Sequence, residues 1–199
     1  MNEQTGQGRF ILVLGGARSG KSTFAQKLAQ SQNLDVTYVA CALPIDKEME
    51  RRIAKHKESR PIGWTTVEAP YSADTAVISA CKKEQFVLWD CVTVFLSNIL
   101  LDYCDKGLGD DEAEASILSR VTHMLCKLED CPGTLVAVSN EVGLGVVPGQ
   151  PLGRSFRDIA GRVNQILAQR ADKVFFIIAG IPVEIKERGY GIQDFGNKI

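Results

Sequence analysis

The segment FILVLGGARSGKS, from Phe10 to Ser22, contains five consecutive apolar residues followed at once by a glycine-rich sequence. Continuous apolar runs are typical of strands that are buried on both faces of a parallel sheet. Beyond the glycines, the residues from Ser22 to Gln32 have apolar side chains at helical spacing, including Phe24 and Leu28. This stretch predicts a central first strand, a glycine-rich turn and a helix that leaves the turn.

The glycine-rich turn matches the pattern GxxxxGK[ST] in the context that this pattern requires, between a strand and a helix. Backbone N–H groups of such a turn can surround phosphate oxygens, and the helix N-terminus adds partial positive charge. Lys21 would reach the β- and γ-phosphates of a nucleotide, and the Ser22 hydroxyl could ligate Mg²⁺. A glycine-rich turn that binds nothing is the alternative. The predicted nucleotide-binding residues are Gly15, Gly16, Ala17, Arg18, Ser19, Gly20, Lys21 and Ser22.

The rest of the chain alternates between short apolar runs and amphipathic segments. Further strands are predicted over Val36–Ala40, Trp64–Val67, Phe86–Trp89, Leu135–Val138 and Val174–Ile178. Helices are predicted over Asp46–Glu58, Ala73–Lys82, Cys91–Asp102, Asp111–Asp130 and Ser155–Ala171. Strands and helices that alternate in this way predict an α/β fold with a mostly parallel sheet and helices on both faces.

Two stretches do not fit this alternation. Asn140–Gly153 is rich in Gly and Pro and is predicted to be irregular and a candidate lid, whereas the polar tail from Glu187 has little to bury. With 199 residues and 45% hydrophobic composition, the chain is long enough for one core but too short for two ordinary domains. We predict a single domain over residues 1–199, with residues 1–9 and about 187–199 flexible.

Charge and composition argue against several functions. A formal net charge of −1 gives no broad basic field, so no nucleic-acid partner is expected. The polar leader does not resemble a secretory signal, and the apolar stretch Val174–Ala179 is far shorter than the roughly 20 residues of a membrane span. These features predict a cytoplasmic protein without a membrane span. The six cysteines form no CxxC pair and are interpreted as buried, reduced thiols: Cys41, Cys81, Cys91, Cys104, Cys126 and Cys131.

Asp90 follows the predicted strand Phe86–Trp89 at its carboxyl end. A carboxylate there could hold Mg²⁺ or polarise a nucleotide group. It could equally cap the next helix, which is worth about 1 kcal/mol. A regulatory GTPase is disfavoured, because NKxD is absent and the DxxG of Asp158–Gly161 lies inside a predicted helix.

The two histidines differ in their surroundings. His123 is out of phase with most apolar residues of its predicted helix and is expected at the solvated surface. His56 ends a charged helix and precedes the basic turn Lys57–Pro61. It could be packed near a helix C-terminus, or it could be a neutral imidazole that attacks an α-phosphorus while Lys57 and Arg60 stabilise the charge. Spacing leaves both interpretations open.

Several segments of the chain, taken together, carry a resemblance to a known family. They are the glycine-rich turn, Tyr38–Ala42, His56–Pro61, Trp64–Glu68, Asp90–Thr93, Val138–Pro148 and Phe156–Gln165. The chain from Phe10 to Lys186 thereby resembles the bifunctional adenosylcobinamide kinase and adenosylcobinamide-phosphate guanylyltransferase family. The resemblance implies a RecA-like P-loop NTPase fold and a homotrimer.

The resemblance also implies two activities. In the kinase step, the terminal phosphoryl group of a nucleoside triphosphate, ATP or GTP, moves onto the aminopropanol hydroxyl of adenosylcobinamide. In the guanylyltransferase step, GTP yields pyrophosphate and a GMP-histidine intermediate, and GMP then passes to adenosylcobinamide phosphate to give adenosylcobinamide-GDP. Mg²⁺ is the implied cofactor, held by Ser22 and the nucleotide phosphates.

Carried over by motif, His56 is the catalytic histidine that accepts GMP. The family also contacts guanine nucleotide at the positions of Ala40, Cys41, Ala42, Lys57, Glu58, Ser59, Arg60, Glu68 and Asp90. Cys41 stands where Thr is expected, and Asp90 stands where Glu is common. Asn140 and Glu141 open a loop that is expected to border the corrinoid site. Two alternatives stay open: a guanylyltransferase without kinase activity, and a regulatory P-loop protein that binds nucleotide.

Overall fold

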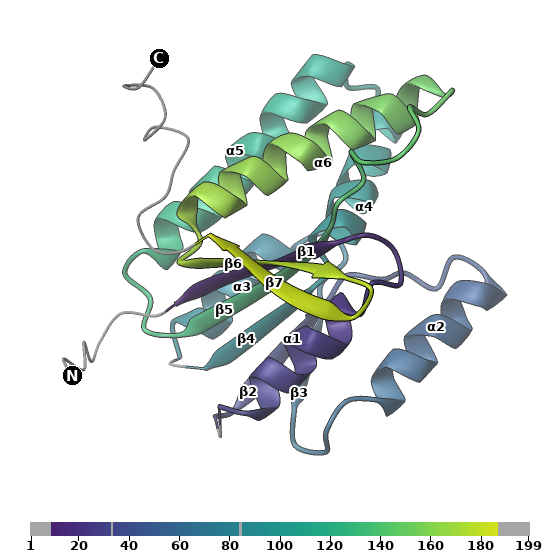
Figure 1. Cartoon of the computed structure of the whole chain (residues 1–199). Coiled ribbons are helices and arrows are strands. Elements are labelled where there is room, and N and C mark those ends of the chain that lie inside the picture. The colour runs from purple at the N-terminus through teal and green to yellow at the C-terminus, as the bar shows by residue number, and fades with distance from the viewer. Residues whose placement is uncertain (1–8, 33, 84, 187–199) are drawn as a thin grey trace, which may run out of the picture.

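One seven-stranded sheet organises the computed structural model, which describes residues 9–32, 34–83 and 85–186 (Figure 1). The strands are β1 (Phe10–Gly15), β2 (Val36–Ala40), β3 (Thr65–Glu68), β4 (Phe86–Asp90), β5 (Thr134–Asn140), β6 (Lys173–Ile178) and β7 (Ile181–Lys186). The helices are α1 (Lys21–Gln30), α2 (Lys47–Glu58), α3 (Ala73–Cys81), α4 (Val92–Asp105), α5 (Asp110–Leu128) and α6 (Pro151–Arg170). Apart from Arg9, the ends predicted to be flexible lie outside the described residues.

The strand order is β3-β2-β4-β5-β1-β6-β7. Every neighbouring pair is parallel except β6 and β7, which are antiparallel. β1 lies between β5 and β6, and its residues from Phe10 to Gly15 are all buried, as the continuous apolar run predicts. The predicted α/β fold with a mostly parallel sheet is confirmed.

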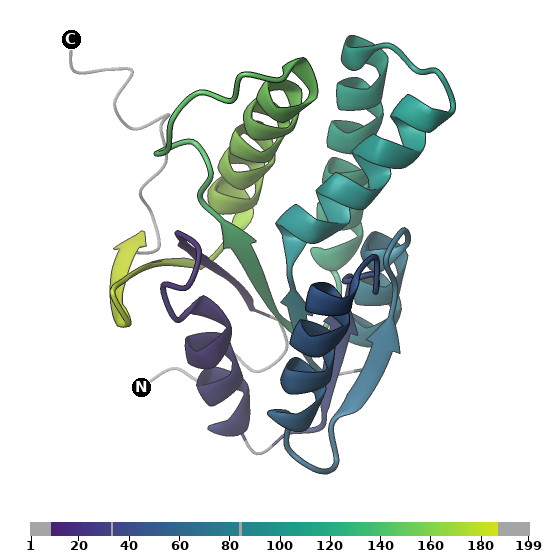
Figure 2. The same ribbon diagram turned by 90° about the vertical axis from the view of Figure 1, so that its right-hand side faces the viewer.

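Helices cover both faces of the sheet, but unequally. On one face α3, α4 and α6 pack against strands, and α5 packs on these three helices (Figures 1 and 2). The larger core lies there, with Trp89 of β4 against Phe95 of α4 at 5.4 Å between ring centroids. On the other face α1 packs on β1, β4 and β5 through Phe24, Ala25 and Leu28.

Helix α2 contains no buried residue, unlike each of the other described helices. Both views show it standing apart from α1 (Figures 1 and 2). Its ends are well formed, because the Asp46 side chain accepts a hydrogen bond from Met49 N at 2.7 Å and basic residues occupy the last turn. Local capping rather than core packing therefore stabilises α2.

Strand β7 is absent from the sequence prediction. Pro182 weakens any strand pattern in this segment, but Pro is tolerated on an edge strand, and β7 is the edge. Lys186 at its end turns back onto α6. The Lys186 Nζ donates to the carbonyl oxygens of Ala168, Gln169 and Ala171 at 2.7, 2.8 and 2.7 Å. It thereby satisfies carbonyl groups at the C-terminal end of that helix.

The segment Asn140–Gly153 is more ordered at both ends than predicted. Asn140 belongs to β5, and α6 begins at Pro151 instead of Ser155. Proline is favourable in the first turn of a helix, where its missing N–H group would have no intrahelical acceptor. The irregular part is therefore limited to residues 141–150.

The prediction for the cysteines is partly wrong. All six are free, as predicted, and Cys41, Cys81 and Cys131 are buried. Cys126 is exposed, because it lies outside the buried stripe of α5, and Cys91 and Cys104 are half-buried. His123 is exposed on the same helix, as expected. None of the helices within the described ranges is long and apolar enough to cross a membrane.

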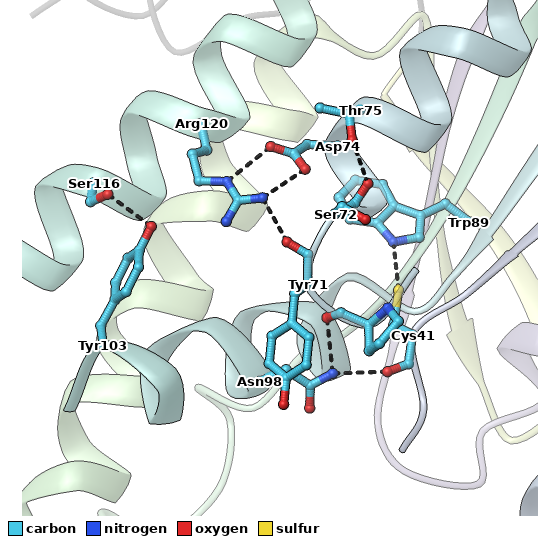
Figure 3. A network of polar contacts seen from close by, with 11 residues as sticks. Cys41, Tyr71, Ser72, Asp74, Thr75, Trp89, Asn98, Tyr103, Ser116 and Arg120 are labelled. Carbon is cyan, nitrogen blue, oxygen red and sulfur yellow. Dashed lines mark hydrogen bonds and ion pairs between the residues drawn. The ribbon is translucent and has the colours of Figure 1, made fainter. Parts of the chain in front are cut away.

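An ion pair fastens α5 to α3 (Figure 3). Arg120 Nε and Nη2 donate to the two carboxylate oxygens of Asp74 at 2.9 and 2.8 Å, and Nη2 also donates to the Tyr71 carbonyl oxygen at 2.8 Å. The Asp74 side chain is only 11% exposed. Loss of the arginine would leave this carboxylate without its charged partner.

We expect Arg120→Met to lower the free energy of unfolding by about 2–3 kcal/mol, because an unpaired carboxylate would stay largely buried. Urea denaturation measures the change. Lys106→Met is the control, since it removes an exposed i,i+4 pair with Asp102 and should cost about 0.5 kcal/mol or less. Equal losses in the two variants would contradict the prediction.

Candidate functional site

The carboxyl ends of the parallel strands bring the predicted site residues to one edge of the sheet. Ala40 of β2 pairs with both Glu68 of β3 and Asp90 of β4, so these three residues form one row. Farther along the sheet, Gly15 of β1 pairs with Asn140 of β5. Open α/β sheets bind ligands outside the carboxyl ends of their strands. The fold therefore brings the glycine-rich turn and Asp90 to the edge where a ligand is expected.

Gly15 begins the turn at a point where no side chain fits. A Cβ atom there would lie 2.6 Å from the carbonyl oxygen of Ile177 and 2.8 Å from Ser19 Oγ. The flanking segments hold the turn on both sides, because Glu141 N donates to Gly15 O at 3.0 Å and Gly180 N donates to Ser19 O at 2.9 Å. The turn is fixed by the chain that follows the two strands neighbouring β1.

Helix α1 presents an uncapped N-terminus to the turn. Its N-cap residue is Gly20, in a left-handed conformation with φ 98°, and no side chain accepts a hydrogen bond from the first turn. Arg18 is also left-handed, with φ 57°. Unsatisfied N–H groups and the partial positive charge of the helix end together suit an anion.

The Lys21 side chain lies inside the turn and is only 7% exposed. Its Nζ donates to the Gly16 carbonyl oxygen at 2.6 Å. Burial lowers the pKa of Lys21, while Cys91 and Asp90 nearby act in the opposite direction. A partly desolvated ammonium group interacts strongly with a phosphate oxygen, which could replace the bond to Gly16.

Two serines of the turn offer hydroxyl groups to a ligand. Ser19 Oγ is buried and makes no hydrogen bond within the described part of the chain, although buried hydroxyls are usually paired. Ser22 is half-buried in the first turn of α1. Mg²⁺ typically takes one or two protein oxygens together with phosphates and water, so Ser22 and Asp90 fit it. No cluster of three or more His, Cys, Asp or Glu that could hold a metal occurs among residues 9–32, 34–83 and 85–186.

Asp90 does not cap the following helix. The N-cap of α4 is Cys91, and the Asp90 Oδ2 instead accepts a hydrogen bond from the Tyr38 hydroxyl at 3.0 Å. Burial raises the pKa of Tyr38, and the Asp90 carboxylate raises it further, so the hydroxyl stays protonated and donates. The Arg60 guanidinium lies over the Tyr38 ring, 3.7 Å from its centroid. The capping interpretation of Asp90 is therefore wrong.

His56 lies exposed near the C-terminal end of α2. His56 thus occupies the helix C-terminus, but the alternative that it is packed there is wrong, because the residue is exposed. Its backbone carbonyl accepts a hydrogen bond from Ser59 Oγ at 3.0 Å, and Glu58 between them is exposed. Among the described residues, no hydrogen bond or ion pair joins the His56 imidazole to the glycine-rich turn.

The basic turn after His56 is attached to β3. Lys57 Nζ donates to Glu68 Oε1 at 2.6 Å, and this hydrogen bond lowers the pKa of the Glu68 carboxyl group. Arg60 Nη1 donates to Thr66 Oγ1 at 3.1 Å, whereas Arg60 Nε is buried without a hydrogen bond to any described residue. The predicted residues Lys57, Arg60 and Glu68 therefore lie together, and the buried Arg60 Nε is available to a ligand.

The Cys41–Ala42 segment offers its backbone rather than the cysteine side chain. Cys41 is fully buried, its Sγ accepts a hydrogen bond from Trp89 Nε1 at 3.2 Å, and burial raises its pKa. Asn98 Nδ2 donates to the carbonyl oxygens of Cys41 and Pro70 at 2.8 and 3.0 Å, and so connects the segments after β2 and β3 (Figure 3). Ala42 is exposed.

Sequence reasoning missed the polar residues that support this edge from within the core. Tyr38 and Asn98 contact residues far away in the chain, so local patterns do not reveal their roles. Asn164 of α6 is only 5% exposed; it accepts from Ser139 Oγ at 2.7 Å and donates to Asn140 O at 3.1 Å. An amide on the apolar face of a helix is a signal that could have been used.

Comparisons with known proteins identify close relatives over most of the chain. A family model described as cobinamide kinase / cobinamide phosphate guanyltransferase matches residues 11–185. The bifunctional adenosylcobalamin biosynthesis protein CobU of Escherichia coli (strain K12) is 42% identical over 180 residues, which cover 88% of this chain and 99% of that protein. The bifunctional adenosylcobalamin biosynthesis protein CobP of Pseudomonas aeruginosa is 43% identical over 176 residues, 88% of this chain and 96% of that protein.

Among solved structures, an ATPase from the type III secretion system of pathogenic bacteria aligns with a TM-score of 0.54 and 15% sequence identity. The alignment covers 89% of this chain and 57% of that ATPase. At this level of identity the likeness concerns the fold alone. It agrees with the predicted RecA-like P-loop NTPase fold.

Gly15→Ala should lower the free energy of unfolding by about 2 kcal/mol or more, because the new Cβ would overlap backbone and φ is 151°. It should also weaken nucleoside triphosphate binding at least about tenfold, since the turn would have to shift. Urea denaturation and calorimetric titration measure the two effects. At Gly16 an added Cβ meets nothing within 4 Å, so Gly16→Ala should keep the stability of the parent. A parent-like Gly15→Ala would refute the argument.

Proposed function

The chain belongs to the cobinamide kinase / cobinamide phosphate guanyltransferase family, and on this premise we propose that it catalyses both reactions on adenosylcobinamide. It would phosphorylate adenosylcobinamide and then transfer GMP from GTP to the phosphorylated product. The observation that carries the proposal is the cradle formed by Gly15–Ser22, with buried Lys21 and an uncapped helix N-terminus. Such a cradle suits the phosphates of a nucleoside triphosphate.

In the kinase step, the substrate hydroxyl attacks the γ-phosphorus and the bond from this phosphorus to the β–γ bridging oxygen breaks. The nucleoside diphosphate leaves, and the hydroxyl proton passes to solvent or to a base. Lys21 would move its hydrogen bond from Gly16 O to the phosphates and offset their charge. Mg²⁺, held by Ser22 with Asp90 close by, would supply further neutralisation of the phosphate charge.

In the guanylyltransferase step, we assign to His56 the attack on the α-phosphorus of GTP. A phosphorus–nitrogen bond forms and pyrophosphate leaves. The phosphate of adenosylcobinamide phosphate then attacks the same phosphorus, the phosphorus–nitrogen bond breaks and His56 is regenerated. The exposure of His56 supports this assignment, since a nucleophile for so large an acceptor must be accessible.

The row at the carboxyl edge and the basic turn would hold the guanine nucleotide. Arg60 supports this part of the proposal, because its buried Nε makes no hydrogen bond within the described ranges and would pair with a nucleotide oxygen. The residues assigned to nucleotide contact outside the cradle are Ala40, Cys41, Ala42, Lys57, Glu58, Ser59, Arg60, Glu68 and Asp90. Cys41 would act through its backbone, since its side chain is fully buried.

The proposal includes a homotrimer that works in the cytoplasm. Apolar side chains exposed on β7, namely Ile181, Val183 and Ile185, support self-association. Six free cysteines agree with a reducing compartment. ATP and GTP are the proposed nucleotide substrates.

His56→Ala should abolish GMP transfer while the protein stays folded, because a nucleophile is removed from an exposed position. Incubation with α-labelled GTP and Mg²⁺, followed by mapping of acid-labile, base-stable label, measures adduct formation. His123→Ala is the matched control, since His123 is also exposed on a helix and should leave labelling unchanged. Label retained in His56→Ala would overturn the assignment of the nucleophile.

Lys21→Ala should lower the rates of both steps by at least about 100-fold, because phosphate charge would lose its buried counter-charge. Phosphorylation of adenosylcobinamide by ATP without GTP reports the kinase step, and adduct formation reports the other. A normal kinase rate in this variant would place phosphoryl transfer outside the cradle. No kinase activity in the parent chain would leave a guanylyltransferase alone.

A further inference from the structure

Tyr38 begins one of the segments that carry the family resemblance, and its side chain contacts both parts of the proposed site. In β2, Tyr38 pairs with Leu88 of β4, and Ala40, two residues later, pairs with Asp90. Leu88 and Asp90 lie on the same face of the sheet, because they are two apart along a strand. Tyr38 packs on this face, which α1 covers, and its side chain extends toward the carboxyl edge. Its hydroxyl reaches Asp90 there.

The Tyr38 hydroxyl fixes one oxygen of the Asp90 carboxylate. Tyr38 is 2% exposed and donates to Oδ2 at 3.0 Å, whereas Oδ1 accepts no hydrogen bond from the part of the chain that the structure describes. One oxygen is thus held, and the other is available to a metal or a nucleotide. Asp90 also interacts electrostatically with Lys21 of the cradle, so its orientation matters at the phosphates.

The Tyr38 ring supports the turn that follows His56. The Arg60 guanidinium lies 3.7 Å from the centroid of the Tyr38 ring. Helix α2 buries no residue of its own, and the pair of Lys57 with Glu68 is at least half exposed on both side chains. Exposed ion pairs hold weakly, so the stack on a buried ring is the firmer anchor of this turn.

We propose that Tyr38 is a positioning residue that couples the two halves of the active site, its hydroxyl orienting Asp90 at the cradle and its ring orienting Arg60 in the turn after His56. Tyr38 touches no reacting atom and acts through these two neighbours. The inference rests on the proposed function, because it assigns the two neighbours to nucleotide contact.

Two substitutions separate the role of the Tyr38 hydroxyl from the role of its ring. Tyr38→Phe removes the hydroxyl and keeps the ring, while Tyr38→Leu removes both. Tyr103→Phe is the matched control, because the Tyr103 hydroxyl also takes part in hydrogen bonding, accepting from Ser116 Oγ at 3.0 Å between α4 and α5. Each variant is assayed for phosphorylation of adenosylcobinamide by ATP and for single-turnover labelling by α-labelled GTP, with urea denaturation as the test of folding.

Tyr38→Phe should lower the maximal rates of both steps by about tenfold and change the apparent nucleotide affinity by less than about threefold, because Asp90 is present but no longer held. Tyr38→Leu should slow labelling by about a further fivefold and leave the kinase rate at the level of the phenylalanine variant. Tyr103→Phe should stay within about twofold of the parent in both assays.

Parent-like rates for Tyr38→Phe would refute the role of the hydroxyl in orienting Asp90. Equal labelling by the Phe and Leu variants would refute the role of the ring in orienting Arg60. Losses of the same size in Tyr103→Phe would show a general packing effect and also overturn the inference. If Tyr38→Leu does not unfold cooperatively, Tyr38→Met fills more of the ring volume and takes its place. Absence of labelling in the parent would refute the proposed transfer mechanism instead, and the kinase assay would still decide the role of the hydroxyl.

Discussion

The close approach of backbone to backbone at Gly15 is the constraint on which the rest of this structure depends. The central strand must end where the Ile177 carbonyl oxygen leaves no room for a Cβ atom. From that point the chain turns back into α1, and hydrogen bonds from Glu141 and Gly180 hold the turn from both sides. The cradle is therefore held as firmly as the sheet, and Lys21 lies within it, hydrogen-bonded to Gly16 O.

The two halves of the proposed site are anchored by different physics. The cradle follows β1, a strand that is fully buried. Asn164 supports the end of the adjacent strand β5, because it accepts a hydrogen bond from Ser139 and donates one to Asn140. The histidine half lies on α2, which has capping hydrogen bonds but no buried residue. Elements with few buried contacts have low local stability, so α2 is expected to exchange its amide protons faster than α1. The two chemical steps assigned to the chain would thus use one rigid and one weakly anchored region.

The sequence was sufficient for the architecture but not for the support of the site. The five apolar residues before Gly15 predict a buried central strand because such a run has no polar face, and the GxxxxGK[ST] pattern places the turn. Strand β7 was missed because Pro182 is a poor strand residue except at an edge, and the position of an edge depends on the whole sheet. Tyr38 was missed because its partners lie 52 positions away at Asp90 and across space at Arg60. The exposure of His56 also could not be read from spacing, since a charged helix can lie on the sheet or away from it.

Lys186 bonds to the C-terminal end of α6, so β7 has a structural role although it lies exposed at the edge of the sheet. Because this ammonium group bonds three carbonyl oxygens, β7 and α6 finish in a common structure beside β6, the strand that presses its Ile177 carbonyl against Gly15. Residues outside the cradle thereby help to hold its wall. Natural variation at Lys186 should accordingly be restricted as if the position belonged to the active site, with selection acting on the mechanical stiffness of the sheet.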